Sequence, residues 1–144
     1  MTEENTVNVL DELNKGASMG VDAINFIIDK VEDKNLEKEL KNQYKEYKKI
    51  LDEISKVYPE YSNKEPHETN AVNKIMTWYG IEMKTFLDKS TSKIAELLMQ
   101  GTNMGIIEGR RLLNHNTTDD DIHRLIQEYV NMQEKAVENL KKFL

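Results

Sequence analysis

Hydrophobic residues recur at every third or fourth position over most of this chain, which is the period of amphipathic α-helices. Two such stripes occupy residues 6–31 and 36–58, and a short polar break separates them. A short link between two long amphipathic helices makes them antiparallel neighbours. The pattern therefore predicts a helical hairpin over residues 6–58, with Asp33 or Asn35 capping its second helix. The expected core positions are Leu10, Leu13, Ala17, Gly20, Ile24, Ile27, Val31, Leu36, Leu40, Tyr44, Tyr47, Leu51, Ile54 and Tyr58.

Two prolines interrupt the helical pattern after this hairpin. Pro59 and Pro66 bracket the longest polar loop of the chain. Because proline disfavours helix in the residue before it, the second helix should end near Tyr58. Helical periodicity returns over residues 70–87, and the polar run that follows predicts a break before the next helix. Residues 59–90 are therefore expected to form a crossover that contains an extra helix.

The extra helix is apolar on two sides. Tyr79 and Met83 share one face, whereas Trp78 and Ile81 point elsewhere. A helix of this kind usually contacts two surfaces. We therefore expect it either to cover the other helices or to take part in an oligomer contact.

A second hairpin is predicted over residues 91–144. Its first helix should span residues 92–114, and Thr117 or Thr118 should provide a hydroxyl cap for the last helix, whose first turn is acidic. The expected core positions are Ile94, Leu98, Gly101, Gly105, Gly109, Leu112, Ile122, Leu125, Tyr129, Met132, Ala136, Leu140 and Phe143. Two hairpins joined by one crossover predict an all-α, up-down four-helix bundle that forms a single domain over residues 1–144.

Glycines repeat between the two hairpins. Gly16 and Gly20 recur as Gly101 and Gly105, an offset of 85 residues, and the same offset relates Tyr44 to Tyr129. A glycine inside a helix costs about 1 kcal/mol relative to alanine, so each is expected where something large approaches the backbone. We interpret the offset as a duplicated hairpin, and we predict that Gly20 packs against Tyr44 and Gly105 against Tyr129.

Composition and charge narrow the functional classes. The 144-residue chain has a net charge of −6, which disfavours binding to nucleic acid or to an anionic membrane surface. It has no cysteine, which excludes disulfides and thiolate metal sites. The acidic N-terminus lacks the pattern of a signal peptide, and no apolar run approaches the roughly 20 residues of a membrane span. We therefore expect a cytoplasmic protein.

Three stretches resemble a bacterial ferritin-like family of unknown function. They are residues 10–16 (LDELNKG), residues 77–82 (TWYGIE) and residues 110–113 (RRLL) at the end of the glycine-bearing helix. The resemblance covers nearly the whole chain and implies a ferritin-like four-helix bundle. It also raises the question of a metal site, since ferritin-like di-iron proteins use a Glu from each of two helices and Glu-x-x-His from each of the other two.

The sequence departs from this di-iron pattern, because no Glu stands three positions before any of its histidines, His67, His115 and His123. The carboxylates nearest the equivalent positions are Asp22, Glu108 and Glu128, which we name as metal candidates for iron or manganese. The thioethers of Met19 and Met104 are further candidates, for Cu(I), although methionine more often fills gaps in a core. Buried tyrosine hydroxyls near carboxylates are compatible either with a small-ligand site or with a satisfied core network.

No nucleophile–base pair, phosphate-binding loop or zinc spacing is present in the sequence. We therefore expect a non-enzymatic protein with no catalytic residue and no cofactor, acting by self-association or by binding a partner. The alternative is a metal-binding ferritin-like protein, either an oxidoreductase or a metal store. The candidate interaction residues are Met19 with Phe26 and Trp78 with Ile81, which the four-helix core does not need. If the extra helix folds back over the first helix, the protein is a monomer, and otherwise a two-fold dimer, which we favour.

Overall fold

The computed structural model describes residues 3–64, 66, 74–115 and 119–144, apart from the side chains at 3 and 74–78. All of the regular structure in these ranges is helical, which confirms the predicted all-α class. Four helices are long: α1 (Glu3–Ile27), α2 (Lys34–Val57), α4 (Thr91–His115) and α5 (Asp120–Leu140). A shorter helix, α3 (Lys74–Thr85), precedes α4. Short 3-10 turns follow α1, α2 and α5, namely η1 (Ile28–Lys30), η2 (Tyr58–Glu60) and η3 (Lys141–Phe143).

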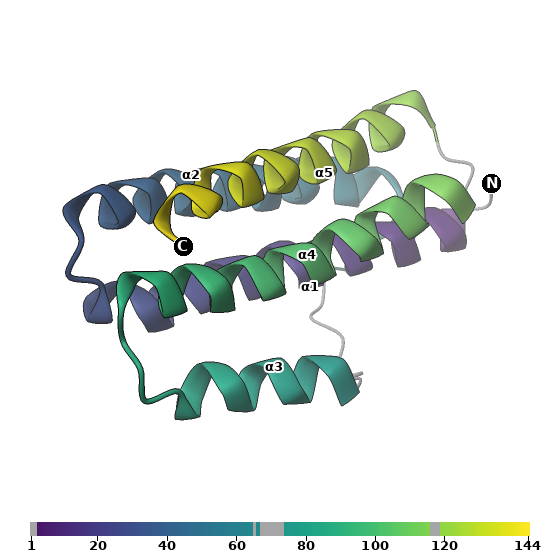
Figure 1. The fold of residues 1–144 in the computed structure, drawn as a ribbon. Coiled ribbons are helices and arrows are strands. Elements are labelled where there is room, and N and C mark those ends of the chain that lie inside the picture. The colour runs from purple at the N-terminus through teal and green to yellow at the C-terminus, as the bar shows by residue number, and fades with distance from the viewer. Residues whose placement is uncertain (1–2, 65, 67–73, 116–118) are drawn as a thin grey trace.

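The four long helices lie side by side as two antiparallel pairs, α1 with α2 and α4 with α5 (Figure 1). The pairs meet where α2 packs on α5 and α1 packs on α4. Because α2 and α4 run in the same direction, the chain must travel back along the whole length of the molecule between them (Figure 1). Helix α3 makes this return on the outside of the α1–α4 pair. None of the helices in the described ranges is both long and apolar enough to cross a lipid bilayer.

The helix ends follow the polar residues that the sequence places there. The Asp33 carboxylate accepts hydrogen bonds from the Asn35 and Leu36 amides at 2.9 and 3.0 Å, so the predicted N-cap of α2 is confirmed. The predicted break before α4 is also present, and the Ser90 hydroxyl accepts a hydrogen bond from the Lys93 amide at 3.3 Å. The N-cap of α5 is Asp119, whose side chain makes no capping bond.

Several predictions fall on residues outside the described ranges. These are the start of the extra helix at 70–73, the hydroxyl cap at Thr117 and Thr118, and His67. The side chain of Trp78 also lies outside them. Tyr79 and Met83, the described members of the predicted inner face of α3, are buried, whereas Ile81 is 55% exposed.

The buried stripe of α2 is shifted by one position in two places from the predicted one. Gln43 and Ile50 are buried where Tyr44 and Leu51 were expected, and these two are only partly buried. Tyr44 instead lies at the edge of the core, where the Lys48 ammonium is 5.7 Å from its ring centre. Likewise in α5, Gln133 is buried and Met132 only partly buried. A stripe chosen by hydrophobicity alone passes over a buried amide, because an amide enters a core wherever it has a hydrogen-bonding role.

One buried hydrogen bond fixes α1 to the end of α2. The Tyr58 hydroxyl donates to the Asp11 carboxylate at 2.8 Å, and both side chains are almost fully buried. Burial, followed by the hydrogen bond to Asp11, raises the pKa of Tyr58 to about 12. The two hairpins are joined more loosely at the surface, where the Tyr61 hydroxyl donates to Asp119 at 2.5 Å.

Candidate functional site

The glycines of α1 and α4 are places where a larger side chain touches the helix backbone. A methyl group at Gly20 would lie 2.5 to 2.7 Å from three ring atoms of Tyr47, and one at Gly101 would lie 2.5 Å from the Tyr79 hydroxyl. Such distances are too short for carbon atoms in contact. The prediction that glycine permits close approach is therefore confirmed at these positions.

The predicted partners of these glycines are wrong. Gly20 contacts Tyr47 instead of Tyr44, because Tyr47 is the residue of α2 whose ring points into the core. Gly105 contacts the Gln133 amide, and Tyr129 contacts Gly16 on the opposite hairpin. The Tyr129 ring therefore crosses between the two hairpins, whereas the contacts of Gly20 with Tyr47 and of Gly105 with Gln133 each lie within one hairpin.

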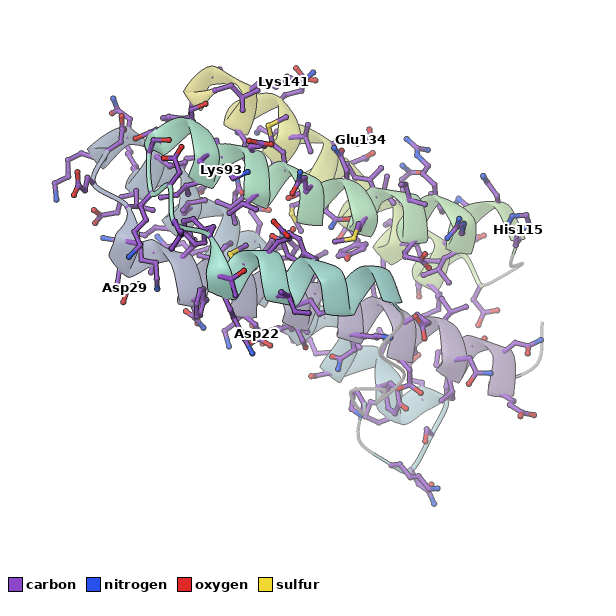
Figure 2. All side chains as sticks on the ribbon, turned by 60° about the horizontal axis from the view of Figure 1, so that its bottom comes forward. Asp22, Asp29, Lys93, His115, Glu134 and Lys141 are labelled. Carbon is purple, nitrogen blue, oxygen red and sulfur yellow. The ribbon has the colours of Figure 1, made fainter. Side chains whose placement is uncertain are left out.

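A pocket of about 100 Å³ opens between α1 and α4, at the level of these glycines. Gly16 and Gly20 line it on the α1 side, and Gly101 and Gly105 line it on the α4 side. Tyr79 of α3 also lines the pocket. Helix α3 lies in front of α1 and α4 in Figure 2. The pocket is thus formed where two helices with small residues face each other under a third helix.

The walls of this pocket are mostly apolar. Two methionines, Met19 from α1 and Met104 from α4, line it and are partly exposed. They are separated by the same 85-residue offset as the glycines. The remaining apolar lining consists of Ala23, Ile24, Leu98 and Leu112.

The floor of the pocket is polar and carries an unpaired acceptor. Gln133 is only 2% exposed, and its Nε2 donates to the Tyr47 hydroxyl oxygen at 3.5 Å. The other end of the same amide, Oε1, is buried and has no hydrogen-bond partner. An unpaired buried carbonyl oxygen is costly, typically about 1–3 kcal/mol. This oxygen is therefore the group of the site that most needs an additional partner.

The hydroxyl groups that line the pocket stay protonated at neutral pH. Burial raises the pKa of Tyr47 and of Tyr129 above the usual tyrosine value. Burial also raises the pKa of Tyr79. The Thr102 hydroxyl is engaged in a bond of 2.7 Å to the Leu98 carbonyl oxygen within α4. The interior of the pocket is consequently uncharged.

Charged side chains are confined to the rim. Glu12, Lys15 and Glu108 line the pocket, and the two carboxylates are exposed to solvent. Glu108 accepts a hydrogen bond of 2.7 Å from Arg111, one turn further along α4. An exposed ion pair of this type contributes little to stability, so the rim remains free to adjust.

Only three of the five predicted metal candidates line the same pocket. Met19, Met104 and Glu108 line the pocket, whereas Asp22 (labelled in Figure 2) is exposed on α1 outside it. Glu128 lies at the α2–α5 seam, where it contributes, after burial, to raising the pKa of Glu53. Within residues 3–64, 66, 74–115 and 119–144, no group of three histidine or carboxylate side chains forms a metal site. His115 and His123 are exposed at the ends of α4 and α5.

The predicted interaction residues do not form one surface patch. Met19 lines the pocket to which Tyr79 of α3 also contributes, although α3 packs on α4 more than on α1. Phe26 is partly buried, and the Lys30 ammonium lies 4.1 Å from its ring centre and donates to its backbone carbonyl. Ile81 is exposed on the side of α3 away from Tyr79.

Gln133 and Tyr47 form the polar part of the site. The sequence predicts Tyr47 as a buried hydroxyl that needs a partner and Gln133 as a candidate partner, but leaves open whether they form a ligand site or a satisfied core network. A signal for Gln133 was present, because it lies four residues after Tyr129 and three before Ala136, on the apolar stripe of α5. A single amide at a core position of an otherwise apolar helix is expected to hydrogen-bond to another core residue. That signal could have directed attention to the pocket.

Comparison with protein-family models, with curated proteins and with solved structures found no significant match. Function must therefore be inferred from the residues of the pocket.

Proposed function

We propose that this chain is a non-enzymatic binding protein and that its partner is a small molecule held in the pocket between α1 and α4. The observation that supports this most strongly is the Gln133 Oε1 atom, which is buried at the pocket floor without a hydrogen-bond partner. Buried polar groups are normally paired, and an unpaired one is explained when a ligand completes the set. The sequence predicts action by self-association or by binding a protein partner, and the small-molecule ligand departs from that prediction. We also propose a cytoplasmic location.

The chemistry of the lining favours binding over catalysis. An acid or base catalyst needs a pKa near the working pH. The polar groups at the floor are the Gln133 amide, which does not titrate, and the Tyr47 hydroxyl, whose pKa burial raises further above neutrality. These groups can donate and accept hydrogen bonds but are poorly suited to proton transfer at pH 7.

The proposal includes a ferritin-like architecture. Two antiparallel helix pairs connected by one long crossover are the topology of ferritin-like folds. The parallel direction of α2 and α4, with α3 in the connection, is consistent with it (Figure 1). The metal-binding alternative, with iron or manganese, draws on this same likeness. It would be favoured if protein produced in iron-rich medium retained stoichiometric metal that only strong chelators remove.

Methionine-methyl NMR tests the ligand proposal directly. The chain has seven methionines, of which Met19 and Met104 line the pocket. A panel of small neutral alcohols and aromatic compounds should shift the methyl signals of these two residues. Met132, at the α2–α5 seam, provides the internal control because it lines a different surface hollow. If no compound shifts Met19 or Met104, or if Met132 shifts equally, the pocket is not the binding site.

Self-association is the second candidate, and the exposure of Ile81 favours it. This side chain is 55% exposed at the outer side of α3, and Leu87, just beyond the helix, is 93% exposed. We propose that a dimer would use this outer face of α3. Light scattering of the parent and of Ile81→Glu decides between the states. A parent that stays monomeric at high concentration, or a dimer unchanged in the variant, removes this interface.

A further inference from the structure

We infer that the ligand of the pocket is a compact, uncharged and mainly apolar molecule that donates one hydrogen bond to Gln133. This inference rests on the proposed function and specifies the chemistry of the ligand. It identifies Gln133 as the residue that determines specificity. The inference combines the size of the pocket, the nature of its walls and the direction of its one unsatisfied hydrogen bond.

The volume limits the size of the ligand. The pocket measures about 100 Å³. An engineered protein cavity of about 150 Å³ accepts benzene, so this smaller pocket encloses at most about six non-hydrogen atoms, and the rest of a larger ligand must project past the partly exposed methionines. Adaptable methionines at the partly exposed wall can yield slightly. Drug-sized molecules and nucleotides are too large, because sites for such ligands are typically about 300–1,000 Å³.

The walls determine the charge of the ligand. Met19 and Met104 present thioethers, and the glycine backbones of α1 and α4 present no side chain at all. The amide of Gln133 and the protonated Tyr47 hydroxyl carry no net charge. Transferring an ion into such surroundings without a paired counter-charge is strongly unfavourable. The two rim carboxylates are on exposed side chains, where water screens them, whereas Lys15 is partly buried.

The floor of the pocket determines which partner donates the hydrogen bond. The Nε2 atom of Gln133 already donates to the Tyr47 hydroxyl oxygen, so the unpaired end of the amide is its carbonyl oxygen. A carbonyl oxygen only accepts hydrogen bonds, and the ligand must therefore supply an O–H or N–H group. The donor group would enter first and reach the floor, and the hydrocarbon part would lie between the two methionines.

Three probes of similar size separate these requirements. Phenol has an apolar ring and a donor, toluene replaces the donor by a methyl group, and fluorobenzene keeps the size of phenol but cannot donate. Titrations followed by the methyl signals of Met19 and Met104 at pH 7 should show phenol binding about tenfold more tightly than toluene and fluorobenzene. This is the size of effect expected for one buried hydrogen bond. Benzoate, which is anionic at this pH, should bind more weakly still.

Two variants assign the effect to the proposed atom. Gln133→Met removes the acceptor at nearly constant volume, and it should abolish the preference for phenol while preserving the binding of toluene. Gln127→Met makes the same substitution on α5 outside the pocket and should keep the preference for phenol. If Gln133→Met does not fold, the ranking of the three probes on the parent still decides the question.

The outcomes distinguish failure of the hydrogen-bond inference from failure of the proposed binding function. If toluene or fluorobenzene binds the parent as tightly as phenol, or if Gln133→Met keeps the preference for phenol, the hydrogen-bond inference is overturned and the pocket remains a binding site. If none of the probes shifts the Met19 and Met104 signals, the binding function itself is overturned.

Discussion

Replacing Gly20 with alanine is expected to destabilise the protein, although alanine is the better helix former. The added methyl group would lie 2.5 to 2.7 Å from three ring atoms of Tyr47. The Tyr47 side chain is 3% exposed and belongs to the hydrogen-bonded floor of the pocket, so its ring has little room to retreat. Gly80, in the middle of α3, is the matched control because a methyl group there meets nothing within 4 Å.

The two substitutions should change stability in opposite directions. In a helix interior, alanine instead of glycine is worth about 1 kcal/mol, and Gly80→Ala should gain roughly this amount. At Gly20 the same gain is opposed by an overpacking cost of about 1–3 kcal/mol. The net change there should range from about zero to about 2 kcal/mol of destabilisation. The free energies of unfolding of the two variants should thus differ by about 1–3 kcal/mol.

Urea denaturation followed by circular dichroism measures this difference. Gly80→Ala should unfold at the highest urea concentration, the parent at a lower one and Gly20→Ala at the lowest. A double-mutant cycle with Tyr47→Leu identifies the contact, because a smaller partner should relieve the cost of the methyl group at position 20. If Gly20→Ala is as stable as Gly80→Ala, the close contact between Gly20 and Tyr47 does not exist and the packing of the pocket floor is wrong.

Three further predictions concern residues outside the pocket. Asp33→Ala removes both capping bonds of α2 and should cost about 1 kcal/mol in urea denaturation. Tyr58 holds its proton in the folded state to a pKa of about 12, above its usual value of 10.0, so its contribution to stability is complete below pH 10 and is lost as the pH rises through 12. Tyr58→Phe should therefore be less stable than the parent at pH 7 by about 1–3 kcal/mol, and this difference should shrink above pH 10. Burial and the neighbouring Glu128 raise the pKa of Glu53, so the folded state favours the protonated carboxyl group, and this contribution to stability is lost as the pH rises and the group ionises. Glu53→Gln cannot ionise, so it should raise the melting temperature slightly at pH 7 and not at pH 4.

The helices were predictable from the sequence because their signals are local. The period of the apolar stripes, the Asp33 cap and the proline after Tyr58 each act within a few residues, and α1, α2, α4 and α5 begin and end close to the expected positions. The class of fold follows from these signals as well, since two hairpins with short links leave few ways to bury their stripes.

The site was less predictable, because it depends on how helices from different parts of the chain face each other. The buried stripe of α2 contains Gln43 in place of Tyr44, which leaves Tyr44 at the edge, and Tyr47 is the tyrosine that packs against Gly20. The hydrophobic pattern of α2 alone does not distinguish Tyr44 from Tyr47, since the two residues are equally apolar. Which tyrosine packs in the core depends on the fit of α2 against α1 and α5, and this fit cannot be read from the pattern of one helix.

Intermolecular nuclear Overhauser effects between bound phenol and the methionine methyl groups test the central claim most directly. Since Met19 and Met104 line the pocket from two different helices, a ligand between α1 and α4 is predicted to give effects from its ring protons to both methyl groups. Met132, at the α2–α5 seam, should give none. Effects to Met132 instead, or to neither Met19 nor Met104, would contradict a binding site between α1 and α4.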